Sequence, residues 1–392
     1  MMFLVWAMGT IFLNFFPNFF EPSITSQLII YSYILTFSIT SIIFSYIIKG
    51  KIGFKKYTFS VDEKMLKVLA ISLFLGLIFF ISRYINLIMS YDTLVEYFFR
   101  VRYASIHLNE PLIETSSLVT QIKTFSMILS VILLYEHYHK KTSKCSNFFL
   151  ISFITLVLIA NVIEGSRNEF VFLSIIYLSI FVLHNRMRNV LIMVSIFFIS
   201  FFVLSLLTRG SSLEGNLLFN YIKHLATYSF GTMISFDSFL SQNISVSSSI
   251  VIKFNDFLLS ISDLLYSLPN SDIITQSPAK FSKISSVDRI NVYSFLSVRI
   301  HYLGFFGAFV SVVLHSFLIT YTYKKSHRPL FMFIYLFMLP TTLLSLFHEY
   351  FFAMIPYYYR VILIVFLLYK VNLTSFCKNF IPASQRFHTI KT

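Results

Sequence analysis

The chain has 392 residues, of which 56% are hydrophobic and only 12% charged, and its mean hydropathy is +0.75. Soluble domains carry about 25% charged residues, so this composition excludes a cytosolic enzyme. The net charge of +14 does not indicate a nucleic-acid partner, because the Lys and Arg residues are scattered between apolar runs. Neither Cys145 nor Cys377 lies beside a second Cys or a His at metal-ligand spacing, so no disulfide framework or metal site is predicted.

Apolar stretches long enough to cross a bilayer recur along the chain, which predicts one integral membrane domain, residues 1–392, with an all-α, polytopic transmembrane helix bundle. About ten spans are predicted, at 2–20, 28–48, 67–89, 112–135, 148–163, 170–184, 190–207, 294–321, 330–348 and 351–370. The first stretch lacks a basic n-region and a small-residue cleavage site, so it is predicted to be a span rather than a removable signal peptide.

The basic residues give the bundle an orientation. Ten spans place both termini on one side, together with 49–66, 136–147, 185–189, 322–329 and the tail after 369. These segments hold more than half of the 31 Lys and Arg residues but only three acidic ones, Asp62, Glu63 and Glu136. Because short basic loops stay inside the cell, we predict that this side and both termini are cytoplasmic.

Two segments on the opposite, outer side are too long to be simple turns. The first, 90–111, is predicted to include a short surface helix. The second, 208–293, contains an amphipathic pattern over 254–265 and an ambiguous stretch at 217–240, which we interpret as re-entrant or interfacial. The alternative is that 208–293 hides two further spans, which gives twelve spans with the same sidedness.

Lysine dominates among the basic residues of the predicted cytoplasmic side, whereas arginine is concentrated in the rest of the chain. The arginines outside the cytoplasmic segments are Arg83, Arg100, Arg102, Arg167, Arg209, Arg289, Arg299 and Arg360. A guanidinium group binds phosphate through a rigid fork and keeps its charge when partly buried, so the set predicts an anion site. Any single arginine has the alternative of pairing with an outer acidic residue or snorkelling to the interface.

The sharpest local feature is a polar hairpin at residues 164–169, between two short apolar runs. It places Arg167 at the outer mouth of the bundle, where water is thin and an anionic headgroup is held strongly. The following helix adds a partial positive charge at its N-terminus. The alternative is an ordinary tight turn in which Arg167 pairs with Glu164 or Glu169.

Two further arginines are candidates for the same outer site. Arg209 ends the seventh predicted span at the outer face, and Arg299 lies inside apolar sequence about one turn into the eighth. An unpaired charge there costs several kcal/mol, so the alternative for Arg299 is a bundle pair with Glu214 or Glu349.

The last outer hairpin carries His348 and Glu349, followed by three tyrosines at 357–359 and by Arg360. A carboxylate or imidazole at the edge of low dielectric can act as general base for a sugar hydroxyl. Aromatic rings stack on sugars, although a belt of tyrosines is also ordinary at a membrane interface.

The sequence contains no Walker loop, GxSxG elbow or HExxH helix, and no cytoplasmic domain large enough for a nucleotide sugar or ATP. Any reaction therefore takes place at the outer face, with an activated substrate already in the membrane. Undecaprenyl-pyrophosphate-linked glycans fit, because the pyrophosphate is both an anion for arginines and a leaving group.

The Phe- and Ile-rich, low-Gly chain, with Gly165-Ser166-Arg167, Arg209-Gly210 and a late outer arginine, resembles the Wzy-type O-antigen and oligosaccharide repeat-unit polymerases of Gram-negative bacteria. The resemblance implies a bundle similar to GT-C-like membrane glycosyltransferases, in the bacterial inner membrane. It also implies metal- and cofactor-independent transfer of the growing glycan from its lipid pyrophosphate to a new lipid-linked repeat at the periplasmic face, and a chain-length regulator as partner.

For this reaction Arg167, Arg209, Arg299 and Arg360 are expected to hold the pyrophosphate, with Glu349 or His348 as base. Two alternatives stay open. An O-antigen ligase uses the same donor but another acceptor, and a flippase or exporter of lipid-linked oligosaccharide makes no bond.

Overall fold

The structure is a computed structural model, and it describes residues 20–50, 61–103, 117–139, 147–164, 167–207, 231–241, 282–283, 289–290, 295–345 and 354–369. Its helices are α2 (Ile24–Ile47), α3 (Glu63–Ile88), α4 (Leu94–Tyr103), α5 (Ser117–His139), α6 (Asn147–Ile163), α7 (Arg167–Leu183), α8 (Met187–Leu207), α11 (Phe295–Lys324), α12 (Pro329–Leu344) and α14 (Ile355–Tyr369). A further helical segment covers 231–241. Two residue pairs, β1 (Ser282–Lys283) and β2 (Arg289–Ile290), form a minimal antiparallel ladder.

The predictions of an all-α fold and of apolar helices are confirmed. Each predicted span from 28–48 onward overlaps a helix, whereas 2–20 lies outside the described residues. Three helices are long and apolar enough to cross a membrane on their own, namely α2, α3 and the Leu303–Lys324 part of α11, and several others are apolar but shorter. Ten crossings therefore stay a prediction.

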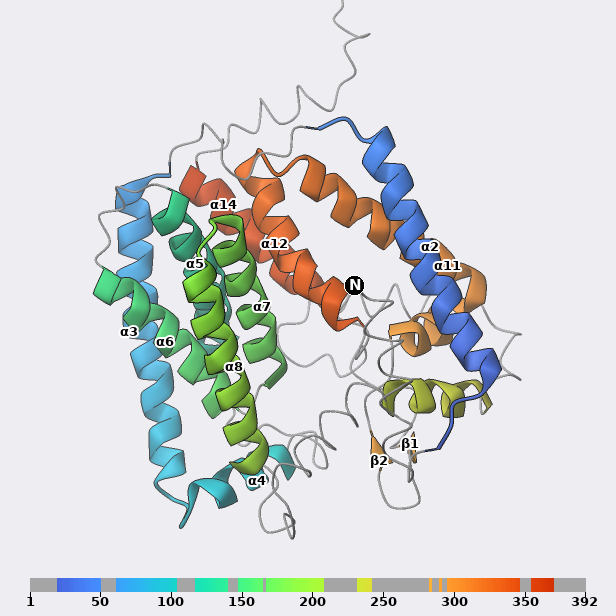
Figure 1. Ribbon diagram of the computed structural model, residues 1–392. Helices are drawn as coiled ribbons and strands as arrows, with labels where there is room; N and C mark the ends of the chain where they lie inside the picture. The colour runs from blue at the N-terminus through green and yellow to red at the C-terminus, as the bar shows by residue number, and fades with distance from the viewer. Residues whose placement is uncertain are drawn as a thin grey trace, which may run out of the picture.

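Successive helices run in alternating directions, so their ends gather at two ends of the bundle (Figure 1). At one end, which we call the basic end, the helices border the segments predicted to be cytoplasmic. Three hydrogen bonds join helix ends there: Asp62 N to Leu368 O (2.8 Å), Lys325 Nζ to Lys49 O (3.2 Å) and Tyr369 Oη to Glu136 Oε1 (2.5 Å). The structure thus places these segments' borders on one side, as the charge distribution predicts.

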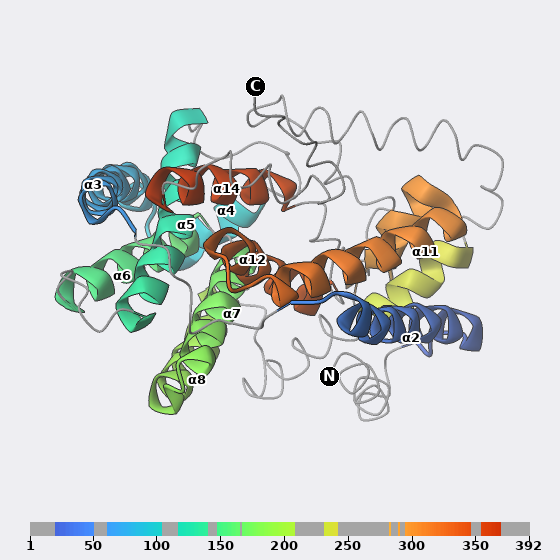
Figure 2. The ribbon, with the colours of Figure 1, turned by 90° about the horizontal axis from the view of Figure 1, so that it is seen from above.

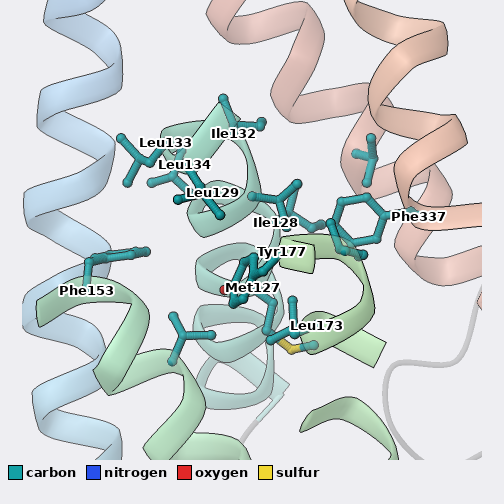
Figure 3. Close-up of a cluster of buried hydrophobic side chains, with 14 of the residues drawn as sticks. Met127, Ile128, Leu129, Ile132, Leu133, Leu134, Phe153, Leu173, Tyr177 and Phe337 are labelled. Atoms are coloured by element: carbon teal, nitrogen blue, oxygen red, sulfur yellow. The ribbon is translucent and has the colours of Figure 1, made fainter. Parts of the chain in front are cut away.

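The helices form two packed groups, with α12 between them (Figures 1 and 2). The larger group comprises α3 to α8, α12 and α14, and its centre is α5, which is buried on all sides from residue 126 to 135. Figure 3 shows that residues 127–134 of α5 meet Phe153 of α6, Leu173 and Tyr177 of α7, and Phe337 of α12. A helix that is apolar all round is typical of such a central position.

The smaller group contains α2, α11 and the segment 231–241. Met233 and Phe236 of that segment are fully buried with Ile30 of α2 and Val312 of α11. The outward side of α2 remains apolar, with Leu35 60% exposed, as expected of a surface that faces lipid. The part of 217–240 that the structure describes is therefore a helix packed on the bundle, and the amphipathic pattern at 254–265 lies outside the described residues.

The prediction of one continuous span at 294–321 is wrong. α11 is broken at Gly304, whose φ of 67° and ψ of 179° are not helical angles. Almost no residue except glycine adopts this conformation. Tyr33 of α2 donates to the carbonyl oxygen of Phe305 at 2.7 Å, directly beside the break. The short N-terminal piece, which carries Arg299, can thus turn back against the long piece.

Candidate functional site

The opposite end of the larger group, which we call the hairpin end, holds a buried charged cluster. α6 ends at Ile163 and α7 begins at Arg167, so the turn between them brings Glu164 and Glu169 to the side of α5. There both carboxylates form salt bridges with Lys123, with a distance of 2.5 Å from Nζ to Glu169 Oε2. The Lys123 side chain is only 5% exposed, whereas the glutamates keep 21% and 20%, so the cluster opens on the carboxylate side.

Tyrosines from three more helices complete this cluster. Tyr357 of α14 donates to Glu169 Oε1 at 2.7 Å, and Tyr84 of α3 makes a long contact of 3.4 Å with Glu164 Oε1. Tyr97 of α4 donates to the carbonyl oxygen of Ile163 at 2.7 Å, so the predicted short helix in 90–111 exists and braces the hairpin. Polar contacts from α3, α4, α5, α7 and α14 therefore converge on one turn.

Among the described side chains, one ammonium group faces two carboxylates in this cluster, so their charges are unbalanced. Burial raises the pKa of the Glu164 carboxyl, the Lys123 ammonium opposes this shift, and the Glu169 charge adds to it. Glu169 lies in the first turn of α7, where the helix dipole favours a negative charge. Burial, and secondarily Glu164, also raises the pKa of the Tyr97 hydroxyl. The two carboxylates thus differ in how well their charges are compensated.

Of the sequence-predicted arginines, two lie close in sequence to this cluster. Arg167 is the first residue of α7, two positions before Glu169, and the glutamates offered as its alternative partners are both engaged by Lys123. Arg360 lies on α14 one turn beyond Tyr357, with its guanidinium 5.1 Å from the ring centre of Tyr359. Within the described part of the chain, its buried Nε atom has no hydrogen-bond acceptor.

Arg299 belongs to a second buried site, in the smaller group. It is 1% exposed, its Nη1 donates to Ser311 Oγ at 3.4 Å, and its Nη2 lies 3.4 Å from His315 Nδ1. The other ring nitrogen of His315 is bonded to Thr342 Oγ1 of α12 at 3.1 Å. These groups line a cavity of about 10 Å³, which holds about one water molecule and not a pyrophosphate.

The structure therefore separates the predicted site residues into two places. No hydrogen bond among the described residues joins the Arg299 site to the hairpin cluster. One short stretch of chain runs from one place to the other. It leaves the Arg299 cavity at Ser345, and the described residues resume at Met354, three positions before Tyr357 of the hairpin cluster. The predicted bases His348 and Glu349 fall in this link, and they lie outside the described residues, as does Arg209.

Sequence reasoning missed Lys123 and His315, which both lie within predicted spans. The available signal was their position, because a charged or ionisable side chain inside an apolar span requires a polar partner. For Lys123 the nearest carboxylates on the outer side included those of the 164–169 hairpin. Which helices meet, however, is not readable from the spans.

Comparison of the chain with protein-family models, curated proteins and solved structures finds no match.

Proposed function

We propose that this protein is a membrane glycosyltransferase that polymerises undecaprenyl-pyrophosphate-linked oligosaccharide repeat units at the outer face of the bacterial inner membrane. The observation that carries the proposal is the buried, partly open cluster of Lys123, Glu164 and Glu169 at the hairpin end, with Arg360 one turn away. Ionisable groups buried in a bundle of apolar helices are costly, and such groups mark functional sites.

The cluster and the arginines supply complementary parts of the reaction. Transfer of a glycan from a lipid pyrophosphate needs cations to stabilise the departing diphosphate and a carboxylate or imidazole to accept the proton of the acceptor hydroxyl. We assign the first role to Arg167, the first residue of α7, and to Arg360 on α14, and from the sequence alone also to Arg209. His348 or Glu349 was assigned the second role from the sequence.

Arg299 has a different role in this proposal. Its cavity is too small for a diphosphate, so we assign Arg299 to holding the two pieces of α11 and the end of α12 together. A substrate that enters there must first displace these contacts.

The break in α11 favours one second candidate, a flippase or exporter of lipid-linked oligosaccharide. Transporters place broken helices and buried charges at their substrate sites, and Gly304 with Arg299 forms such a pair. A ligase remains the third reading, with the same donor and another acceptor.

Deleting the gene in its native strain and analysing lipopolysaccharide on gels separates these functions. A polymerase predicts core carrying a single repeat unit. A ligase predicts bare core with polymer left on the lipid carrier, and a flippase predicts bare core with repeats trapped inside the cell. Complementation with Arg167→Lys should shorten or abolish the chains at normal protein level, because an ammonium cannot replace a two-pronged fork.

A further inference from the structure

We propose that Glu164 is the catalytic base of this reaction, held in place by Lys123, while Glu169 is a positioning residue. The inference rests on the proposed function and deepens it, because it transfers the role of base from the 346–353 connection to the hairpin. It follows from the different bonding of two carboxylates that share one ammonium.

The bonding pattern distinguishes the two glutamates. Both oxygens of Glu169 are taken by short bonds, Oε2 to Lys123 at 2.5 Å and Oε1 to Tyr357 at 2.7 Å. Among the described residues, Glu164 Oε2 is bonded to Lys123, whereas Oε1 has only the long 3.4 Å contact with Tyr84. Glu164 Oε1 is therefore the one oxygen of the two carboxylates that holds no short bond to a described residue, and it is the best able to accept a hydrogen bond from a substrate hydroxyl. With 21% of its side chain exposed, Glu164 is also reachable from the hairpin end.

The charges around Glu164 suit a proton acceptor. Among the described side chains, the groups that act on the pair are Tyr84 of α3, Tyr97 of α4, Lys123 of α5 and Tyr357 of α14, and Lys123 is the cation of this set. Glu169 has both Lys123 and the N-terminus of α7 beside it, whereas the charge of Glu169 opposes a second negative charge on Glu164, so a charge on Glu164 is compensated less well. When environments drive two neighbouring carboxyls apart in pKa, the less stabilised one is suited to exchange a proton near neutral pH.

The reaction step balances as follows. The acceptor sugar hydroxyl transfers its proton to Glu164 as its oxygen bonds to the anomeric carbon of the donor glycan. The bond between that carbon and the pyrophosphate oxygen breaks, and its electron pair leaves with the lipid pyrophosphate. Glu164 then releases the proton to water at its exposed side, and Arg360 stabilises the charge that develops on the leaving group.

The test uses the full-length protein in liposomes with the undecaprenyl-pyrophosphate-linked repeat unit of its native strain. Glu164→Gln is expected to lower kcat at least 100-fold with little change in KM, and to remove the acidic limb of the pH–rate profile. Glu164→Asp should retain part of the rate together with that limb. Glu169→Gln should slow the reaction less and keep the limb, and Glu96→Gln, a carboxylate of α4 outside the cluster, should behave as wild type.

Two results separate failure of the inference from failure of the function. If the wild type forms polymer and Glu164→Gln does so within about threefold with the same pH profile, Glu164 is not the base and the polymerase proposal stands. If the wild type forms no polymer, both are overturned.

A second measurement needs no variant. Infrared spectra of the wild type should show a protonated buried carboxyl that titrates over the pH range of the acidic limb. Absence of such a titration overturns the inference even where Glu164→Gln does not fold.

Discussion

Replacing Lys123 by methionine tests whether the ammonium holds the hairpin end together. Methionine fills nearly the same volume but removes the ammonium group that forms salt bridges with both Glu164 and Glu169. Removing one partner of a buried ion pair costs about 3–5 kcal/mol, and we expect the lower end because the glutamates keep about a fifth of their exposure. The triple variant Lys123→Met/Glu164→Gln/Glu169→Gln removes all three of these charges together and should return to within about 1 kcal/mol of wild type.

The measurement is the free energy of unfolding from titration with dodecyl sulfate in mixed micelles, followed by circular dichroism. The loss of unfolding free energy in Lys123→Met should become smaller as the pH falls, because a protonated carboxyl needs no cation. The pKa of the carboxyl is higher in the folded form, so the folded form binds the proton more tightly than the unfolded form and gains stability at low pH. If Lys123→Met is as stable as wild type, or if the triple variant is as unstable as the single one, the cluster is not an electrostatic unit.

Three further predictions concern the break in α11, its arginine and the orientation. Gly304→Ala forces a Cβ into a conformation with φ of 67° and should cost about 1–3 kcal/mol in the same titration. Arg299→Ala leaves the buried polar groups of Ser311 and His315 without this partner and should lower the free energy of unfolding by about 1–3 kcal/mol. If the variant is as stable as the wild type, Arg299 does not hold these helices together. Cys145 and Cys377 are predicted to be cytoplasmic, so they should not react with a membrane-impermeant maleimide in intact spheroplasts. A cysteine introduced by Ser90→Cys, at an exposed position after α3, should react. The opposite labelling pattern would show that the orientation of the bundle is the reverse of the predicted one.

The helices were predictable because bilayer crossing imposes length and apolarity on each segment separately. Sidedness is predicted in the same way, from short basic segments taken one by one, and the assignment of that side to the cytoplasm stays a prediction. The borders of 49–66, 322–329 and the tail after 369 lie together at the basic end. The distribution of charge predicts this common side without any knowledge of how the helices pack.

The break in α11 was not predictable for a local reason. Gly76 and Gly307 also lie inside apolar helices, yet among the described glycines only Gly304 has a positive φ. A glycine permits a break without requiring one, and the decision rests with neighbours such as Tyr33, which bonds the carbonyl of Phe305.

The cluster at the hairpin end depends on tertiary contacts in the same way. The sequence draws attention to the hairpin through its charges, and it offers pairing of Arg167 with Glu164 or Glu169 as the alternative to an anion site. The structure adds a partner that the sequence did not suggest, Lys123, from a helix about 40 residues earlier, because α5 is the centre about which α6 and α7 pack. Pairing across helices is a property of the packing.

The imbalance of that cluster leads to a last prediction. Lys123 and Glu169 alone form a neutral pair, so stability does not require a second carboxylate at Glu164, and its burial opposes ionisation. Glu164→Gln should therefore be at least as stable as wild type at neutral and higher pH. The advantage should vanish as the pH falls below the raised pKa of Glu164, where the wild type is protonated as well. Proteins retain such costly groups where activity needs them. A loss of more than about 1 kcal/mol in Glu164→Gln at neutral pH would instead assign Glu164 to structure, because a net hydrogen bond contributes about that much.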